Sequence, residues 1–242
     1  MINRLTFLST TFNFMVNSEA TKGHCVTCLA AEAIHGLCEG CREDLPLNQW
    51  CCRMCALPLA FPVSTGCCGE CLATPPPFRS SLIPWRYQFP VDGMIGRYKY
   101  HGQRKFIRPL LNGFVGFLEQ SLTDDELPEL IIPAPMHWAR RWQRGFNQAQ
   151  EIAEFAGAQL GVPVAGRLVR RRKRVRAQRN LDRNRRLKNL KGVFEVCAPV
   201  PARIAIVDDV VTTGATARAL AAALERAGAS EIQLWALART PG

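Results

Sequence analysis

The segment from Ile204 to Ala227 places acidic, hydroxyl and glycine residues in an order suited to a phosphorylated sugar. A continuously apolar run leads into Asp208 and Asp209. The residues that follow are Val210, Val211, Thr212, Thr213, Gly214, Ala215 and Thr216. Gly214 permits a tight turn close to an anion, and the amide N–H groups that begin the next helix can face one phosphate. Because carboxylates repel phosphate, the two aspartates suit the hydroxyls of an attached sugar instead.

Other nucleotide-binding loops do not fit this chain. It contains neither the G-x4-G-K-[ST] pattern of a P-loop nor the G-x-G-x-x-G pattern of a dinucleotide fold. An ordinary strand–turn–helix with one capping threonine requires neither a second acid nor three threonines. The pattern therefore favours a phosphate-binding loop over a plain turn.

A second group of polar residues follows the apolar run Leu130-Ile131-Ile132. Arg140, Arg141 and Arg144 lie between this expected strand and an expected helix. Guanidinium groups match phosphate oxygens in bidentate geometry. The sequence therefore predicts a pyrophosphate-holding segment beside the phosphate loop.

Four Cys-x2-Cys pairs predict one or two structural zinc ions. Each pair directs two thiolates at one point, so two pairs complete a closed tetrahedral shell. The predicted ligands are Cys25, Cys28, Cys38, Cys41, Cys52, Cys55, Cys68 and Cys71. Sequential pairing is the simplest arrangement, interleaved pairing is the alternative, and Cys51 and Cys67 offer substitute ligands. Free thiols or a redox relay are the competing interpretation of the cluster.

The charge of the chain is concentrated in one segment. Residues 167–191 hold thirteen Lys and Arg and one acid, so this segment carries a formal charge of +12. The whole chain has a formal net charge of +11, so all the other residues together sum to −1. Such a segment attracts a polyanion: a nucleic acid such as single-stranded DNA, an anionic membrane surface, or a small phosphorylated substrate. A solvated basic helix is the plain alternative.

Alternating strands and helices after residue 77 predict a parallel α/β sheet. We expect strands at residues 130–132, 203–207 and 232–237, and helices at 105–122, 146–160 and 216–227, the last two stopped by Gly161 and Gly228. The proline run at residues 75–77 suggests a boundary. The expected divisions are an extension at 1–22, a cysteine-rich module at 23–77 and the α/β domain at 78–242.

The expected location is the cytoplasm. Residues 1–22 lack the basic leader and the long apolar run of a secretory signal, and no stretch of the chain is apolar enough to predict membrane insertion. Clustered cysteines in a reducing compartment are more often metal ligands than disulfides.

The aspartate–threonine loop resembles the phosphoribosyl pyrophosphate signature of type I phosphoribosyltransferases. With the cysteine pairs, the Tyr98-Lys99-Tyr100 string, the Arg144-to-Gln148 string and residues 178–194, the chain resembles the ComF family, which includes GntX-like proteins. The resemblance covers nearly the whole chain from Cys25 onward. It implies a zinc ribbon followed by a phosphoribosyltransferase-like sheet with helices on both faces. It also implies an association with DNA uptake and natural transformation, with other competence proteins as expected partners.

The resemblance implies roles for particular residues. Asp208 and Asp209 would contact the ribose hydroxyls, and residues 212–216 would hold the 5-phosphate. Lys99 and the arginines at 140, 141 and 144 would meet the pyrophosphate, together with Mg²⁺. Residues 170–190 would form a mobile loop over the site, including Gln178, Arg186 and Asn189.

Three functions compete at this stage. The first is a phosphoribosyltransferase that displaces pyrophosphate at ribose C1. The second is a non-catalytic competence factor that uses the fold to bind nucleic acid or a ligand. The third is a zinc-stabilised scaffold, which has no need for adjacent aspartates and a threonine loop.

Overall fold

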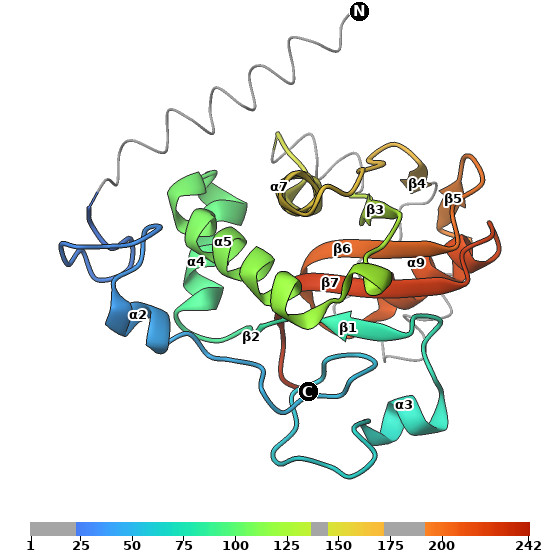
Figure 1. Cartoon of the computed structure of the whole chain (residues 1–242), viewed down its shortest axis with the longest axis horizontal. Coiled ribbons are helices and arrows are strands. Elements are labelled where there is room, and N and C mark those ends of the chain that lie inside the picture. Colours follow the sequence, from blue (N-terminus) through green and yellow to red (C-terminus); the bar gives the residue numbers. More distant parts are fainter. Residues whose placement is uncertain (1–22, 137–144, 172–191) are drawn as a thin grey trace, which may run out of the picture. The chain divides into compact units, whose positions relative to one another are not determined.

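The computed structural model describes residues 23–136, 145–171 and 192–242 (Figure 1). These residues form two compact units. The first contains residues 23–46 and 88–113, and the second contains residues 47–87, 114–136, 145–171 and 192–242. The predicted boundary after residue 77 is one of composition and stays a prediction.

A five-stranded parallel sheet forms the centre of the second unit. Its main path runs β1 (Ser80–Leu82), β7 (Glu231–Arg239), β6 (Arg203–Val211) and β3 (Leu130–Pro133), while β2 (Trp85–Arg86) also pairs with β7. Every pairing within this sheet is parallel. Residues 204–207 are fully buried, as expected for a parallel strand covered on both faces. The predicted parallel α/β class is confirmed.

The long predicted helices are present with small shifts at their ends. They are α5 (Arg104–Ser121), α7 (Gln148–Leu160) and α9 (Ala215–Glu225). Gly161 caps α7 in the left-handed conformation, as predicted. The prediction that Gly228 caps α9 is wrong, because Arg226 is the C-cap and Gly228 lies two residues beyond it.

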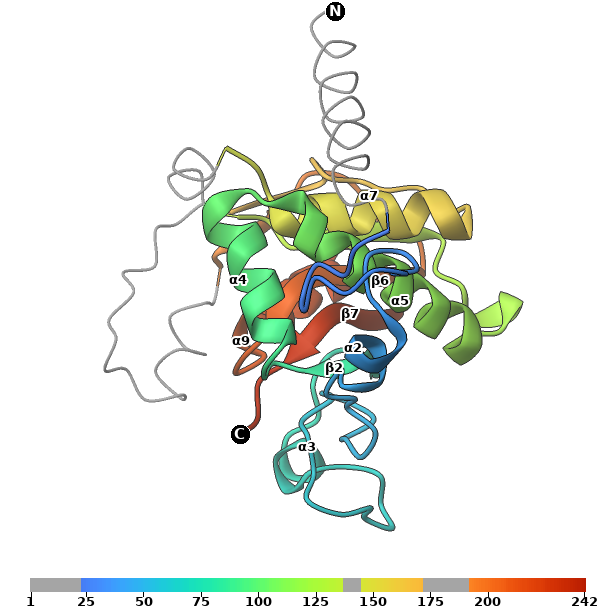
Figure 2. The ribbon, with the colours of Figure 1, turned by 90° about the vertical axis from the view of Figure 1, so that its left-hand side faces the viewer.

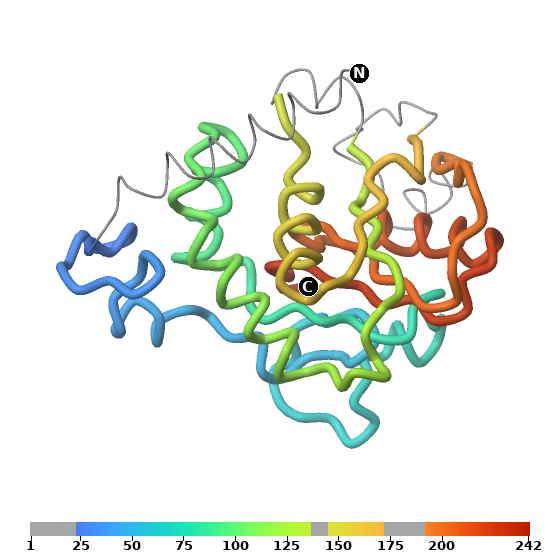
Figure 3. Tube along the Cα trace, turned by 45° about the horizontal axis from the view of Figure 1, so that its top comes forward, coloured from blue at the N-terminus to red at the C-terminus, as the bar shows by residue number. Residues whose placement is uncertain are grey.

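Strand β6 extends further than predicted, through both aspartates to Val211. The reason is its neighbour β7, with which it pairs from Arg203↔Glu231 to Val211↔Arg239. The pairing of β3 with β6 ends earlier, at Pro133↔Val207. Figure 3 traces β3 and β6, distant in sequence, running side by side.

The direction of the chain reverses between β3 and β6. From β3 the chain passes through α7 to Val164, which pairs in parallel with Ile131 on the side of β3 away from β6. From β6 the chain passes through α9 to β7, which lies on the side of β6 away from β3. Right-handed crossovers place two such helices on opposite faces, and Figure 2 shows α7 and α9 on different sides of β6 and β7. The carboxyl ends of β3 and β6 therefore meet at a topological switch point, where ligands of open α/β sheets bind.

The remaining elements are short, apart from one helix. The first unit holds α2 (Glu39–Glu43) and α4 (Val91–His101). The second holds α3 (Gly69–Ala73), the 3₁₀ turn η1 (Asp124–Glu126) and an antiparallel pair, β4 (Val169–Arg171) with β5 (Phe194–Val196). None of the helices in the described ranges has the length and apolar character needed to cross a bilayer.

Candidate functional site

Asp208 and Asp209 lie near the carboxyl end of β6, toward the switch point. Asp209 is 8% exposed and Asp208 is half-buried. The Asp209 N–H donates to Asp208 Oδ1 at 2.8 Å, and the Val210 N–H donates to Asp209 Oδ1 at 2.6 Å. An ionised carboxylate is an acceptor of hydrogen bonds, so both side chains are of a type suited to hydroxyl groups.

The loop after β6 turns at Gly214 and opens onto the N-terminus of α9. Gly214 is the N-cap, with φ 70° and ψ 2° in the left-handed region. Thr213 Oγ1 accepts a hydrogen bond from the Ala215 N–H at 3.4 Å. Thr212 is exposed, while Thr213, Gly214 and Thr216 are half-buried. The turn therefore has the conformation that brings backbone amides to an anion at a helix N-terminus.

Arg239, the last residue of β7, contacts the same loop and is absent from the predicted site. The residue is 3% exposed. The guanidinium donates to the carbonyl oxygens of Val211, at 3.3 Å, and Thr212. The sequence offers one indication of this residue, an arginine that ends the apolar run of β7. A charge buried at such a place is unfavourable unless it has hydrogen-bond partners.

The end of β3 is joined to β6 at the switch point. The Ala134 N–H donates to the Val207 carbonyl at 2.7 Å, and Asn147 Nδ2 donates to the Ala134 carbonyl at 3.3 Å. Asn147 belongs to the string from Arg144 to Gln148 and is the N-cap of α7. The structure thus brings Ala134 and, through it, the N-cap of α7 next to the aspartate-bearing strand.

Several predicted contacts stay predictions. Arg140, Arg141 and Arg144 lie outside the described residues, as do Gln178, Arg186 and Asn189. Lys99 is half-buried on α4, which belongs to the first compact unit.

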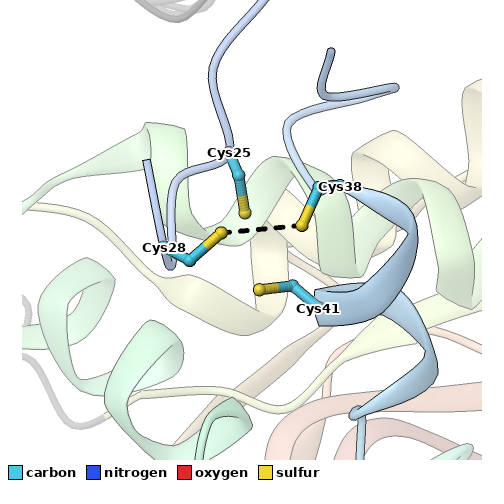
Figure 4. A group of neighbouring side chains, drawn as sticks. All are labelled: Cys25, Cys28, Cys38 and Cys41. Carbon is cyan, nitrogen blue, oxygen red and sulfur yellow. Dashed lines mark hydrogen bonds between the residues drawn. The ribbon is translucent and has the colours of Figure 1, made fainter. Parts of the chain in front are cut away.

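The first cysteine tetrad consists of Cys25, Cys28, Cys38 and Cys41, whose sulfur atoms all lie within 4.8 Å of one another (Figure 4). The Sγ atoms of Cys28 and Cys38 are 3.6 Å apart. A tetrahedral zinc site with Zn–S bonds of about 2.3 Å has edges of about 3.8 Å. The donor set and its spacing therefore fit a closed four-thiolate zinc site.

The second tetrad consists of Cys52, Cys55, Cys68 and Cys71 and has the same design. The Sγ atoms of Cys55 and Cys68 are 3.7 Å apart. Three of its cysteines are buried and Cys55 is half-buried. The sequential pairing is confirmed over the interleaved one, and Cys51 and Cys67 belong to neither tetrad.

Both tetrads repeat one backbone turn. The residue after the second cysteine has a positive φ in each, 66° at Leu29 and 53° at Ala56. The N–H of that residue donates to the carbonyl of the first cysteine, at 2.9 Å for Leu29 and 2.7 Å for Ala56. The other pair then spans the start of a short helix, α2 or α3, each with a cysteine as N-cap.

Backbone donors stabilise one thiolate in each tetrad. Burial raises the pKa of the Cys25 thiol, but backbone N–H groups of Cys28, Cys38 and Thr27 outweigh this and lower the pKa to about 6. Cys52 follows the same pattern: burial raises its pKa, while backbone groups of Cys55, Cys68 and Met54 lower it to about 7. Thiolates are the form that binds metal, so each tetrad can hold a zinc ion.

No family profile matches the chain. A purine phosphoribosyltransferase from Pyrococcus horikoshii is similar over 55% of this chain and 82% of its own, with 16% identity and a TM-score of 0.34. A score this low does not assign the fold, which rests on the strand order described above.

Curated relatives place the chain in a family. It is 33% identical to competence protein F of Haemophilus influenzae over 213 residues, covering 86% of this chain and 92% of the relative. It is 33% identical to the DNA utilization protein YhgH of Escherichia coli strain K12 over 227 residues, covering 86% and 98%. Competence protein ComFC of Streptococcus pneumoniae shares 29% over 154 residues, covering 63% and 65%. These similarities, together with the two tetrads and the parallel sheet, show that the chain belongs to the ComF family.

Proposed function

We propose that this protein binds phosphoribosyl pyrophosphate and transfers its ribosyl group with loss of pyrophosphate. One observation carries the proposal: the left-handed turn at Gly214 opens onto the N-terminus of α9, directly after two adjacent carboxylates at the switch point. A phosphate at the turn and hydroxyls at the carboxylates describe a ribose 5-phosphate. The same geometry has no use in a scaffold.

The chain's own residues account for the chemistry at C1. Asp208 and Asp209 accept hydrogen bonds from the ribose hydroxyls and hold the sugar, and their negative charge favours the positive charge that develops on the ring. The amides of residues 212–216 hold the 5-phosphate. The arginines at 140, 141 and 144 stabilise the departing pyrophosphate. Mg²⁺, a hard cation suited to carboxylate and phosphate oxygens, would neutralise charge on the pyrophosphate when bound.

The cellular setting follows from the relatives, which are named for competence and for DNA utilization. We infer that this chain acts on, or beside, DNA taken up by the cell, in the cytoplasm and together with other competence proteins. Eight of the eleven cysteines form the two tetrads, and clustered cysteines in a reducing compartment are more often metal ligands than disulfides.

A second candidate function is binding of single-stranded DNA without transfer chemistry. The basic segment 167–191 carries more cations than one pyrophosphate needs. In the described part of the chain, Arg167 and Arg170 are exposed, and the Arg171 guanidinium lies 5.8 Å from the centroid of the Phe194 ring. Contacts between such arginines and the phosphates of DNA would give an affinity that falls steeply as the salt concentration rises.

Calorimetric titration with phosphoribosyl pyrophosphate and Mg²⁺ tests the first candidate. The variant Asp208→Asn/Asp209→Asn keeps the shape of both side chains and removes both charges. An amide oxygen accepts a weaker hydrogen bond than a carboxylate does, so binding should weaken by about 1.5–3 kcal/mol, or at least about tenfold. The matched control is Asp124→Asn/Asp125→Asn, the same change at two exposed acids of η1, which we expect to bind as the wild type does.

Absence of binding by the wild type would exclude the transferase. Single-stranded DNA titrated at two salt concentrations then separates the candidates. Strong, salt-sensitive DNA binding without binding of phosphoribosyl pyrophosphate favours the second function.

A further inference from the structure

The second cysteine tetrad is fastened to the sheet through its own backbone. Asn48 Nδ2 donates to the Ala56 carbonyl at 2.9 Å, and the Ser81 N–H donates to the Arg53 carbonyl at 3.1 Å. Ser81 Oγ also donates to the Met54 carbonyl. Asn48 and Ser81 are buried. The turn from Cys52 to Ala56 is therefore held against β1, and Figure 1 shows the segment of this tetrad beside β1 and the C-terminus.

Arg239 links this turn to the phosphate loop. Its Nε donates to the Cys55 carbonyl at 3.1 Å, while Nη1 donates to the carbonyls of Val211 and Thr212. Nη1 also donates to the Thr240 carbonyl at 2.9 Å. One buried guanidinium thus contacts the metal-ligand turn and the first residues of the loop.

These contacts orient the amides that an anion would use. In a trans peptide the C=O and N–H point in opposite directions. The Val211 carbonyl is held on the β7 side by Arg239 and by the Thr240 N–H at 3.0 Å. The N–H groups of Thr212 and Thr213 share peptide units with the two bound carbonyls, so they face away from β7. That is the β3 side of β6, the side of the switch point.

A second arginine joins the tetrad to α9. Arg218, in the first turn of α9, has Nη2 3.8 Å from Cys71 Sγ, and its Nη1 donates to the Thr74 carbonyl at 3.2 Å. It also pairs with Glu70 at 3.5 Å. Strand β7, which contacts the loop through Arg239, and helix α9, which follows the loop, are therefore each tied to the second tetrad.

Charge supports the same connection. A buried guanidinium is unfavourable without a nearby negative charge. Four thiolates with one zinc ion carry a net charge of −2. The metal-bound tetrad would supply this charge beside Arg239 and Arg218, whereas protonated thiols would not.

We propose that Arg239 is a positioning residue, through which the second tetrad in its metal-bound form sets the geometry of the phosphate loop. The tetrad is then part of the binding site's support. The inference rests on the proposed function for its ligand, and its test includes an arm that does not.

The binding arm compares Arg239→Gln with Arg239→Lys by titration of phosphoribosyl pyrophosphate with Mg²⁺. Glutamine removes the charge and the fork, and we expect at least about tenfold weaker binding with two zinc ions retained per chain. Lysine keeps the charge without the fork and should recover part of the affinity. The control is Arg79→Gln, the same change at an exposed arginine at the opposite end of the sheet, ion-paired with Glu231 at 2.8 Å. Wild-type affinity in folded Arg239→Gln would overturn the proposal.

The second arm measures hydrogen exchange of the amides at residues 211–216 without ligand. We expect faster exchange there in Arg239→Gln, and in Cys68→Ser after loss of the second metal. Cys38→Ser, which removes a ligand of the first tetrad, should change this segment less. If the wild type binds no phosphoribosyl pyrophosphate, the proposed function fails while this arm still decides. Unchanged exchange at 211–216 in both Arg239→Gln and Cys68→Ser would refute the link.

Discussion

At the scale of single residues, the phosphate loop depends on one backbone conformation. Gly214 adopts φ 70°, and a Cβ added there would meet nothing within 4 Å. Any penalty for a side chain at this position is therefore conformational, because there is space for it.

Because the penalty is conformational, two substitutions at Gly214 should differ in their effect on stability. Gly214→Val should lower the free energy of unfolding by about 1–2 kcal/mol, because a β-branched residue is strained in the left-handed region. Gly214→Asn should lower it less, since asparagine tolerates that conformation. Urea unfolding of both variants gives the comparison. Equal stability of the two would mean that the turn relaxes out of the left-handed region.

The role of Arg239 depends on contacts with remote residues, whereas that of Gly214 depends on its own backbone conformation. The position of Arg239 follows from no local pattern, yet its hydrogen bonds reach Cys55 and Val211, far from it in the chain. The role of this buried cation therefore depends on contacts that form only in the folded protein.

At the scale of elements, α7 packs closely against the segment that follows it, which contains Val162 and Val164. A Cβ on Gly157 would lie 2.6 Å from the Val162 carbonyl oxygen and from Val164 Cγ2. Val164 is the residue that pairs with Ile131 beside β3. The glycine thus lets the segment after α7 return against its own helix.

Two helical glycines therefore respond oppositely to alanine. Gly157→Ala should destabilise the protein by about 1–3 kcal/mol, because the new methyl group overpacks against backbone. Gly116→Ala, in α5 where nothing lies within 4 Å, should stabilise it by about 0.5–1 kcal/mol through helix propensity. Thermal or urea unfolding measures both. A stabilising Gly157→Ala would show that the Val162–Val164 segment shifts freely.

At the scale of the whole molecule, the two tetrads belong to different compact units. Cys25 to Cys41 lie in the first unit, and Cys52 to Cys71 lie in the unit that contains the sheet. Each metal would therefore stabilise its own unit, with folding free energy coupled to metal binding.

The purified protein should contain two zinc ions per chain. Removing them with a chelator should lower the melting temperature strongly, because structural zinc contributes on the order of 10 kcal/mol. Elemental analysis and thermal unfolding with and without chelator measure this. Metal-free protein with all eleven thiols titratable and an unchanged melting temperature would contradict both sites.

The sequence by itself determined the features that depend on short spacing. The Cys-x2-Cys pairs, the turn at Gly214 and the apolar runs of β3, β6 and β7 are local, because metal geometry, backbone conformation and side-chain periodicity act within a few residues. Only the tertiary structure decided which strands pair, how far β6 extends and that Arg239 joins a cysteine turn to the loop. The short strands β1 and β2 were missed for the same reason, since each is ordered by pairing with β7. Strand pairing and the burial of a charge depend on neighbours that are remote in sequence, and no local pattern records them.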